Sequence, residues 1–319
     1  MCVTLKKLFN RLLKNKPLIV LIITSIIVAI LNPRFLTWGN ILTVLRQTSV
    51  NAVIATGMTF AILIGGIDLS VGSVLGLCGA IAAAMISSGT SVFVTVIVIL
   101  LLGTAIGFLN GTLITFGRLQ PFIATLGTVT LLRGIILVFT QGRPINTGSS
   151  GASEAFGNIG TGFIGPVPIP VYIMVIVFIA AYYILNHTPI GRYIYAAGSN
   201  EEATMYSGIN TNKVKLFVYS VSGMTAALAG ILITARLGSA QPTAGAGYEL
   251  DAIAAVVLGG TSMAGGIGTI AGTAIGALII GVLNNALNLM QVSSYYQDVA
   301  KGIVILIAVL LDRKQKLSR

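Results

Sequence analysis

The chain has 319 residues, of which 55% are hydrophobic and 8% are charged, and its mean hydropathy is +0.95. A soluble domain carries about 25% charged residues, so this composition excludes an ordinary soluble enzyme or binding domain. The net charge of +11 does not indicate nucleic-acid binding, because the basic residues gather beside apolar segments, as in membrane proteins. The composition predicts an all-α, polytopic membrane protein with a single transmembrane domain over residues 1–319 and lipid around it.

Apolar segments recur along the whole chain, between three basic stretches. The stretches are 1–17 at the start, the interior loop 188–213 and the end, 312–319. Basic residues favour the cytoplasmic side of a membrane, so both termini and this loop are predicted to be cytoplasmic. That orientation requires an even number of spans, and ten are predicted. The segments are about 18–36, 50–64, 69–88, 91–116, 121–139, 167–187, 214–236, 251–264, 267–289 and 297–311.

Two of these segments are too short to cross a bilayer. Segments 50–64 and 251–264 fall below the roughly 20 residues that a spanning helix needs. Both end in a glycine pair, within GGIDLSVG (65–72) and GGTSMAGG (259–266). Corresponding broken segments in two halves of a transporter indicate an internal repeat with the solute pathway at its interface. The alternative is that these glycines only allow close helix packing.

Asp68 lies just after the first predicted break. Together with Ser70 it can cap the next helix, because a side-chain oxygen accepts hydrogen bonds from free amide groups there. An ionisable residue at membrane depth can also face a cavity. Both interpretations remain open. The predicted solute pathway comprises Gly65, Gly66, Asp68, Ser70, Asn110, Gly259, Gly260, Asn284, Asn285 and Asn288.

Asparagines provide most of the other polar side chains of that pathway. Asn284 and Asn288 share a helical face, and Asn285 lies between them. Amides suit a hydroxyl-rich solute, but they can equally bond one helix to another.

Charged side chains within the predicted spans need partners. Arg133 requires one or a path to water, and Asp298 and Lys301 are predicted to neutralise each other at the start of the last span. The loop 140–166, rich in Gly, Pro and Ser, is predicted to be irregular and extracytoplasmic.

Catalytic and metal-binding motifs are missing from the sequence. It contains no Walker-type phosphate loop, no HExxH and no GxSxG, and His187 is its only histidine. The two cysteines, Cys2 and Cys78, indicate neither a disulfide framework nor a metal site. No catalytic residue, metal or cofactor is therefore predicted in this chain, and energy for transport is expected to come from another protein.

The cytoplasmic loop carries a short predicted helix. Ser199-Asn200-Glu201-Glu202 fits a capping box with Ser199 as N-cap, and Gly208 suits the C-terminal stop. A helix of two turns is not stable alone, so it must dock. It docks either on a partner protein or on its own membrane domain.

At this loop the sequence resembles a known family. Glu202-Ala203-Thr204, three residues and then Gly208 is similar to the Glu-Ala-Ala-x-x-x-Gly signature of the ABC importer permeases. Thr204 replaces the second alanine. Over about residues 32–312 the chain resembles their ribose-type branch. The matching segments include QTSVNAVIATGMTFAILIGGIDLSVGS (47–73), PFIATLGTVTLLRGI (121–135), GRYIYAAGSNEEATMYSGIN (191–210), SAQPTAGAGYELDAIAAVVLGGTSMAGGIGTIAGTAIGAL (239–278) and GVLNNALNLMQVSSYYQ (281–297).

This resemblance implies a permease subunit that moves a monosaccharide, with ribose favoured, across the cytoplasmic membrane. It implies a homodimer, a cytoplasmic ABC ATPase that holds ATP and magnesium, and an extracytoplasmic sugar-binding protein. The coupling segment to the ATPase would comprise Ser199, Asn200, Glu201, Glu202, Ala203, Thr204 and Gly208. The first alternative is an ion-coupled secondary sugar carrier, and the second is a channel or an intramembrane enzyme. Dependence on ATP and partner proteins separates these classes.

Overall fold

The computed structural model describes residues 16–317. The predicted basic segment 1–17, apart from its last two residues, and the end of the predicted tail 312–319 lie outside this range. The described chain is almost entirely helical. In chain order its elements are α2 (Lys16–Leu31), η1 (Pro33–Leu36), α3 (Trp38–Leu63), α4 (Val71–Ser87), α5 (Val92–Thr115), α6 (Pro121–Thr140), β1 (Ile145–Asn146), α7 (Gly151–Thr161), β2 (Phe163–Ile164), β3 (Val167–Pro168), α8 (Ile169–His187), α9 (Pro189–Ser199), α10 (Glu201–Tyr206), α11 (Thr211–Leu237), β4 (Ser239–Ala240), α12 (Tyr248–Leu258), α13 (Ile270–Leu289) and α14 (Ser294–Leu317).

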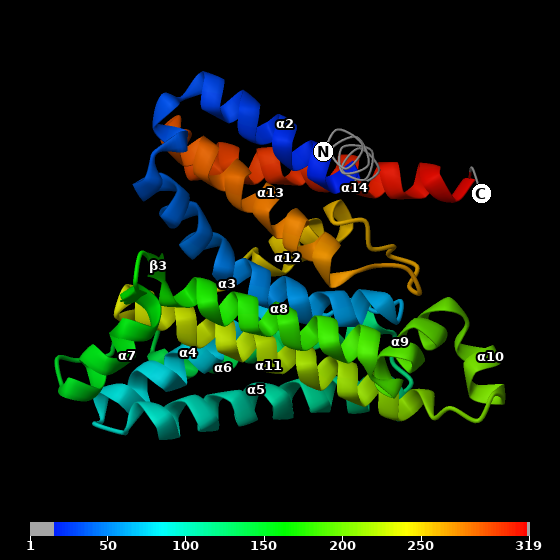
Figure 1. Ribbon diagram of the computed structural model, residues 1–319. Helices are drawn as coiled ribbons and strands as arrows, with labels where there is room; N and C mark the ends of the chain where they lie inside the picture. Colours follow the sequence, from blue (N-terminus) through cyan, green and yellow to red (C-terminus); the bar gives the residue numbers. More distant parts are fainter. Residues whose placement is uncertain (1–15, 318–319) are drawn as a thin grey trace.

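The long helices form a bundle in which α5, α8, α11 and α14 run roughly along one direction and α2, α3 and α13 are tilted relative to them (Figure 1). Helices α9 and α10 lie at one end, the α10 end, and α7 lies with β3 at the other, the α7 end. Each of the ten predicted apolar segments overlaps one helix: α2, α3, α4, α5, α6, α8, α11, α12, α13 or α14. Within the described range, α5, α6, α8, α11 and α13 are long and apolar enough to cross a membrane.

The two predicted short segments have different outcomes. The prediction for 50–64 was wrong, because α3 starts at Trp38 and has 26 residues. The first half of α3 carries polar residues such as Arg46. The Cζ atom of Arg46 lies 4.8 Å from the centre of the Phe163 ring, a favourable cation–π distance, and the helix continues through this residue. The prediction for 251–264 is confirmed. Helix α12 has 11 residues and is about 16 Å long, too short for a hydrocarbon core of about 30 Å.

The predicted irregular loop 140–166 is also more ordered than expected. Ser150 is the N-cap of α7, and its hydroxyl accepts a hydrogen bond from the Ser153 amide. Buried Phe156 anchors the helix, and Gly160 lets it approach α11 so closely that a Cβ there would lie 2.2 Å from the Arg236 amide nitrogen. The small residues therefore serve helix packing. Strands β2 and β3 pair antiparallel with Phe163 opposite Pro168, and β1 pairs with β4 with Ile145 opposite Ala240.

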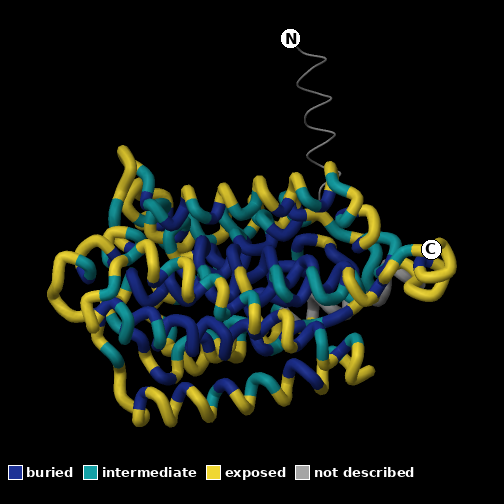
Figure 2. Tube along the Cα trace, turned by 90° about the horizontal axis from the view of Figure 1, so that it is seen from below, coloured by how far each residue is buried: buried dark blue, intermediate teal, exposed yellow. Residues whose placement is uncertain are grey.

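Buried residues gather in the interior and exposed ones follow the outer helices (Figure 2). Many of the exposed side chains are large and apolar, among them Phe93 on α5 and Val138 on α6. A soluble protein rarely exposes so much apolar surface, whereas lipid covers it without cost. The helix surfaces therefore fit a membrane protein.

Helix α11 forms the centre of the bundle and packs on α3, α4, α5 and α7. Its contact with α5 depends on glycines, because Gly103, Gly107 and Gly111 recur every four residues along α5. A Cβ at Gly107 would lie 2.1 Å from the Tyr219 carbonyl oxygen, and one at Gly223 would lie 2.1 Å from the Gly103 carbonyl oxygen. Small residues at these positions let the two backbones touch.

This contact predicts a stability difference between two glycine substitutions. Gly107→Ala forces α5 away from α11 and is expected to lower the free energy of unfolding by about 1–3 kcal/mol. Gly127→Ala is the matched control, because Gly127 lies on α6 and no atom lies within 4 Å of the point where an added Cβ would sit. Thermal unfolding of both variants in detergent measures the effect. Equal melting temperatures would contradict the packing described for α5 and α11.

Candidate translocation site

The first helix break follows α3 at Leu63. The Gly65 amide donates to the Ile62 carbonyl and the Gly66 amide to the Ala61 carbonyl, with Gly65 at φ +75°. This double hydrogen bond closes a helix end and needs a residue that tolerates a left-handed backbone. The predicted role of the glycine pair in ending α3 is therefore confirmed.

Asp68 forms the end of a buried chain of hydrogen bonds. Its Oδ2 accepts from the Ser222 hydroxyl at 2.7 Å, and its Oδ1 accepts from the Ser70 hydroxyl at 2.6 Å and the Ser70 amide at 3.0 Å. Asn110 Nδ2 donates to Ser70 Oγ at 2.8 Å, and the Thr128 hydroxyl donates to Asn110 Oδ1 at 2.6 Å. One chain of hydrogen bonds thus connects four segments of the bundle: the first break, α5, α6 and α11.

The capping interpretation of Asp68 and Ser70 was wrong. Ser70 is the N-cap of α4, but its side chain makes no capping bond. Asp68 accepts from the Ser70 amide, which precedes the first turn of the helix. Asp68 is 1% exposed and does not line either polar cavity described below. Its carboxylate instead accepts from Ser70, two residues along the chain, and from Ser222 of α11. A pathway role for Asp68, Ser70 and Asn110 stays a prediction.

The second break follows α12 and repeats the ending of the first. The Gly260 amide donates to the Val257 carbonyl and the Thr261 amide to the Val256 carbonyl, with Gly260 at φ +89°. Gly260 therefore corresponds to Gly65. The predicted alignment of the two motifs paired Gly259 with Gly65 and was thus shifted by one residue. Gly259 is the residue before it and packs on α13, where a Cβ would lie 2.4 Å from the Gly272 carbonyl oxygen.

The two breaks touch each other and α9. The Gly266 amide donates to the Leu63 carbonyl at 2.9 Å. Gly198 of α9 fits against both breaks, because a Cβ there would lie 1.8 Å from the Leu63 carbonyl oxygen and 2.6 Å from the Gly266 nitrogen. A Cβ at Gly265 would lie 2.8 Å from the Gly198 carbonyl oxygen. We call Gly65, Gly198, Gly265 and Gly266 the glycine junction.

Tyr195 adds a second connection from α9 to the second break. Its hydroxyl donates to the Gly268 carbonyl at 2.9 Å. Burial raises the pKa of the Tyr195 phenol, so the hydroxyl keeps its proton at neutral pH and remains a donor. Through Gly198 and Tyr195, α9 therefore contacts the end of α3 and the residues that follow α12.

Gly65 and Gly66 line a cavity at the α10 end, which we call the break cavity. It has a volume of about 450 Å³, and Arg118, Glu201 and Lys215 contribute charged groups to its wall. Gly65 and Gly66 thus border a polar cavity, and their role in the solute pathway stays a prediction. The cavity joins the first break to the start of α10.

Asn284 and Asn288 line a second cavity, of about 230 Å³, which we call the amide cavity. Its wall comprises Gln47, Thr48, Asn51, Arg236, Tyr248, Asp251, Ala277, Ile280, Gly281, Asn284, Asn288, Gln297 and Lys301. Arg236 is the residue before the last of α11, and Gln297 lies in the first turn of α14, so the cavity lies toward the α7 end. The predicted common face of the two asparagines therefore meets a cavity.

Asn285 belongs to a helix contact instead. Asn40 Nδ2 donates to Asn285 Oδ1 at 3.0 Å, and Asn285 Nδ2 donates to Asn40 Oδ1 at 2.9 Å. This reciprocal pair joins α13 to α3. The alternative interpretation, that an amide bonds two helices, thus fits Asn285.

Two predictions about charged residues have opposite outcomes. The predicted Asp298–Lys301 pair was wrong, because Lys301 Nζ lies 3.1 Å from Asp251 Oδ2 on α12, a residue distant in sequence. Arg133 has the partner that it needs: its Nη1 donates to the Ala244 carbonyl at 2.7 Å, where the segment before α12 enters the bundle.

Helix α10 follows α9 and precedes α11 along the chain, and it lies at the end of the bundle (Figure 1). Its N-cap is Asn200, whose Oδ1 accepts from the Ala203 amide at 2.9 Å, so the predicted capping box with Ser199 and Glu202 was wrong. Ser199 remains the last residue of α9, and its hydroxyl donates to the Tyr195 carbonyl. Gly208, at φ +82°, ends α10 as predicted.

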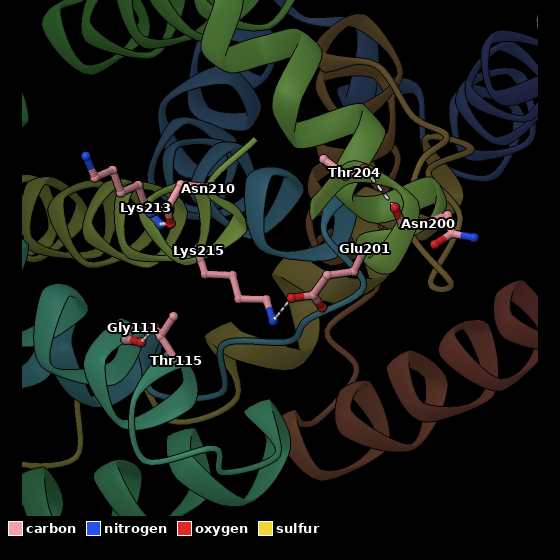
Figure 3. A network of polar contacts seen from close by, with 8 residues as sticks. All are labelled: Gly111, Thr115, Asn200, Glu201, Thr204, Asn210, Lys213 and Lys215. Atoms are coloured by element: carbon pink, nitrogen blue, oxygen red, sulfur yellow. Dashed lines mark hydrogen bonds and ion pairs between the residues drawn. The ribbon is translucent and has the colours of Figure 1, made fainter. Parts of the chain in front are cut away.

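The side chains of α10 point mostly away from the bundle. Glu201, Glu202, Met205 and Tyr206 are exposed, and Glu201 pairs with Lys215 of α11 at 2.5 Å (Figure 3). Thr204 is buried, and its hydroxyl donates to the Asn200 carbonyl at 2.7 Å, which accommodates the departure from alanine within the helix.

Several residues of these sites were not predicted from the sequence. Thr48 and Asn51 lie three residues apart on one face of α3, a spacing that could have been noticed. Asp251 was placed at the edge of a predicted segment and given no partner. Ser222 and Thr128 carry no sequence signal, because a lone hydroxyl in an apolar helix ordinarily bonds its own backbone.

Comparison with known proteins places the chain in a family. Residues 40–309 match the family described as branched-chain amino acid transport system / permease component. The chain belongs to this family. It is therefore a multi-pass membrane permease component of a transport system, which confirms the predicted fold class.

Individual relatives match over almost their full length. The chain is 60% identical over 301 residues to a ribose import permease protein of Haemophilus influenzae, covering 94% of this chain and 93% of the relative. It is 57% identical over 305 residues to a ribose import permease protein of Escherichia coli, covering 96% and 95%. A D-allose transport system permease protein of Escherichia coli is 43% identical over 296 residues, covering 91% and 90%. No solved structure matches the chain.

The hydrogen bonds of Asp68 predict graded effects of substitution. Asp68→Leu leaves the Ser70 and Ser222 donors without an acceptor, at about 1–3 kcal/mol for each buried unpaired group, and is expected to lower the melting temperature strongly. Asp68→Asn keeps one oxygen and should be milder. Ser220→Ala is the control on α11, because the Ser220 hydroxyl bonds only to Leu216 of its own helix. A Leu variant as stable as wild type would contradict the structural role of the carboxylate.

Proposed function

We propose that this chain is the membrane-spanning subunit of an ATP-binding-cassette importer for a monosaccharide, most specifically ribose. The observation that carries the proposal is α10, an exposed two-turn helix connected through α9 and the glycine junction to both helix breaks. The relatives named as ribose import permeases support the cargo. Transport driven through these contacts requires a partner protein that binds α10 and displaces it.

The partner at α10 is a cytoplasmic ATPase in this proposal. Met205 is 55% exposed and Tyr206 is 85% exposed, beside the acidic Glu201 and Glu202. Such a mixed apolar and acidic surface fits a groove in another protein. The basic residues near this loop support placing the α10 end, and with it both termini, in the cytoplasm of a bacterial inner membrane.

The mechanism follows from the contacts of α9. ATP-driven closure of two ATPase subunits displaces α10, and α9 transmits this movement to the residues after α3 and α12 through Gly198 and Tyr195. The break cavity and the amide cavity then open and close in alternation. ATP and magnesium belong to the ATPase, and an extracytoplasmic sugar-binding protein delivers the solute at the α7 end. A second copy of this chain completes the importer, because two ATPase subunits require two coupling helices.

An ion-coupled secondary sugar carrier is the alternative, and it is weaker. Such a carrier needs an ionisable group that exchanges ions with water in the pathway. Asp68 is buried within hydrogen bonds and Asp251 is paired with Lys301. Neither arrangement resembles an open ion site.

Reconstitution tests the proposal directly. The chain is placed in proteoliposomes with its ATPase and its sugar-binding protein, and uptake of labelled ribose is measured with and without ATP. We expect uptake only with ATP and both partners, since Asp68 is buried and Asp251 is paired with Lys301. Ribose uptake by the chain alone would instead favour the carrier.

A matched pair of tyrosine substitutions tests the role of α10. Tyr206→Ala removes an exposed ring from α10 and is expected to reduce co-purification of the ATPase at least about tenfold, as truncation of an interface aromatic does. Tyr295→Ala is the control, because Tyr295 is also 85% exposed but begins α14 toward the α7 end. Co-purification of the ATPase, quantified at equal membrane abundance, is the measurement. Full binding by the Tyr206 variant would remove α10 from the interface.

A further inference from the structure

The amide cavity is a funnel with a polar floor. Gln47 and Asn288 at its mouth are exposed, whereas Thr48, Asn51 and Asp251 are buried at 2%, 8% and 8% exposure. Its volume of about 230 Å³ greatly exceeds the 10–15 Å³ or so that a single water requires. The funnel thus has room for a small ligand beyond a structural water.

Oxygen atoms on this floor and wall have no hydrogen-bond partner within the described protein. They are Thr48 Oγ1, Asn51 Oδ1 and Asn284 Oδ1. Unpaired buried polar groups are costly and rare in native proteins. Thr56, two turns along the same helix, shows the usual arrangement, because its hydroxyl donates to the Ala52 carbonyl. The unpaired groups of the amide cavity therefore point to a ligand.

Contacts on both sides hold this space open. Asn40 and Asn285 join α3 to α13 on one side, and the Thr59 and Thr273 hydroxyls meet at 2.7 Å on the other. Between them Gly281 leaves room for the Thr48 hydroxyl, since a Cβ there would lie 1.8 Å from Thr48 Oγ1. The cavity is thus enclosed by two fixed contacts of the same helix pair.

The charges around the cavity restrict the ligand. Lys301 and Asp251 neutralise each other at 3.1 Å, and Arg236 adds positive charge. A cationic ligand is therefore disfavoured. A carboxylate offers only acceptors, so it cannot bond the amide oxygens of Asn51 and Asn284. A hydroxyl both donates and accepts, which satisfies those oxygens and the amide donors of the same side chains.

We infer that the amide cavity is a binding site for a neutral, hydroxyl-rich solute of monosaccharide size, formed within a single copy of this chain. The inference rests on the proposed function for the direction of transport and for ribose as the cargo. The site receives solute at the α7 end, between α3, α12, α13 and α14. It is thus a station of the pathway separate from the break cavity.

Binding to the purified full-length chain in lipid nanodiscs tests the site without ATPase or sugar-binding protein. The melting temperature is measured at increasing ribose concentrations, because a ligand that binds the folded state stabilises it. For Thr48→Val and Asn284→Leu, the ribose concentration that gives half of the maximal shift should rise about tenfold, as loss of one hydrogen bond of about 1.4 kcal/mol requires. Without ribose, Thr48→Val should be at least as stable as wild type, because it removes an unpaired hydroxyl.

Thr56→Val is the matched control and should leave the ribose response unchanged. Leucine is the control solute, since its carboxylate and ammonium do not fit the floor. Three outcomes would overturn the inference. They are an equal half-maximal ribose concentration for the Thr48 variant and wild type, no shift of the wild-type melting temperature by ribose, and stabilisation by leucine in place of ribose. The two proposals can fail separately. If ribose binds to wild type and Thr48→Val weakens that binding, but the complete system shows no ATP-driven uptake, the site is retained and the importer is rejected.

Discussion

The hydrogen bond from the Gly266 amide to the Leu63 carbonyl joins the two segments in which helices stop inside the bundle. Around this bond, Gly65, Gly198 and Gly265 bring three backbones into contact without side chains. Gly265 and Gly266 combine a close approach with a positive φ angle, and Gly65 has a positive φ angle, so glycine is favoured at all three positions. The position of α9, and through it of α10, depends on this junction.

The two cavities lie along the helices that this junction connects. Helix α3 contributes Thr48 and Asn51 to the amide cavity, and the break cavity begins where α3 ends, at Gly65. Helix α13 starts after the second break and carries Asn284. A shift at the junction therefore changes the ends of helices that line both cavities. The Asp68 hydrogen bonds resist such a shift, because they connect the first break to α5, α6 and α11.

The order of the helices was predictable because each helix of the bundle needs its own apolar segment in lipid, and each predicted segment overlaps an α-helix. The number of spans stays a prediction, since five helices of the described range are long and apolar enough to cross a membrane. The same logic failed for α3, whose predicted segment began at residue 50, whereas the helix begins at Trp38. Near the end of the bundle a polar side chain such as Arg46 can reach a partner, here the Phe163 ring, without breaking the helix. The end of α12 was predictable because a glycine pair followed a segment that was too short.

The partners of polar side chains were not predictable, because they join helices far apart in sequence. Lys301 pairs with Asp251 rather than with Asp298, and Ser222 reaches Asp68 across the bundle. Among three neighbouring asparagines, Asn285 joins two helices while Asn284 and Asn288 line a cavity, a division that depends on helix rotation. The N-cap of α10 moved from Ser199 to Asn200, because α9 continues through Ser199 before the chain turns.

The most direct test of the central claim is the number of ribose molecules taken up per ATP hydrolysed by Gly198→Ala in the reconstituted complex. A Cβ at residue 198 must push α9 away from the Leu63 carbonyl, while the exposed surface of α10 stays unchanged. The account predicts that the ATPase still binds and hydrolyses ATP at a membrane abundance equal to that of wild type, and that ribose uptake per ATP falls several-fold. An unchanged ratio in this variant would contradict the claim that the glycine junction connects α10 to the transport pathway.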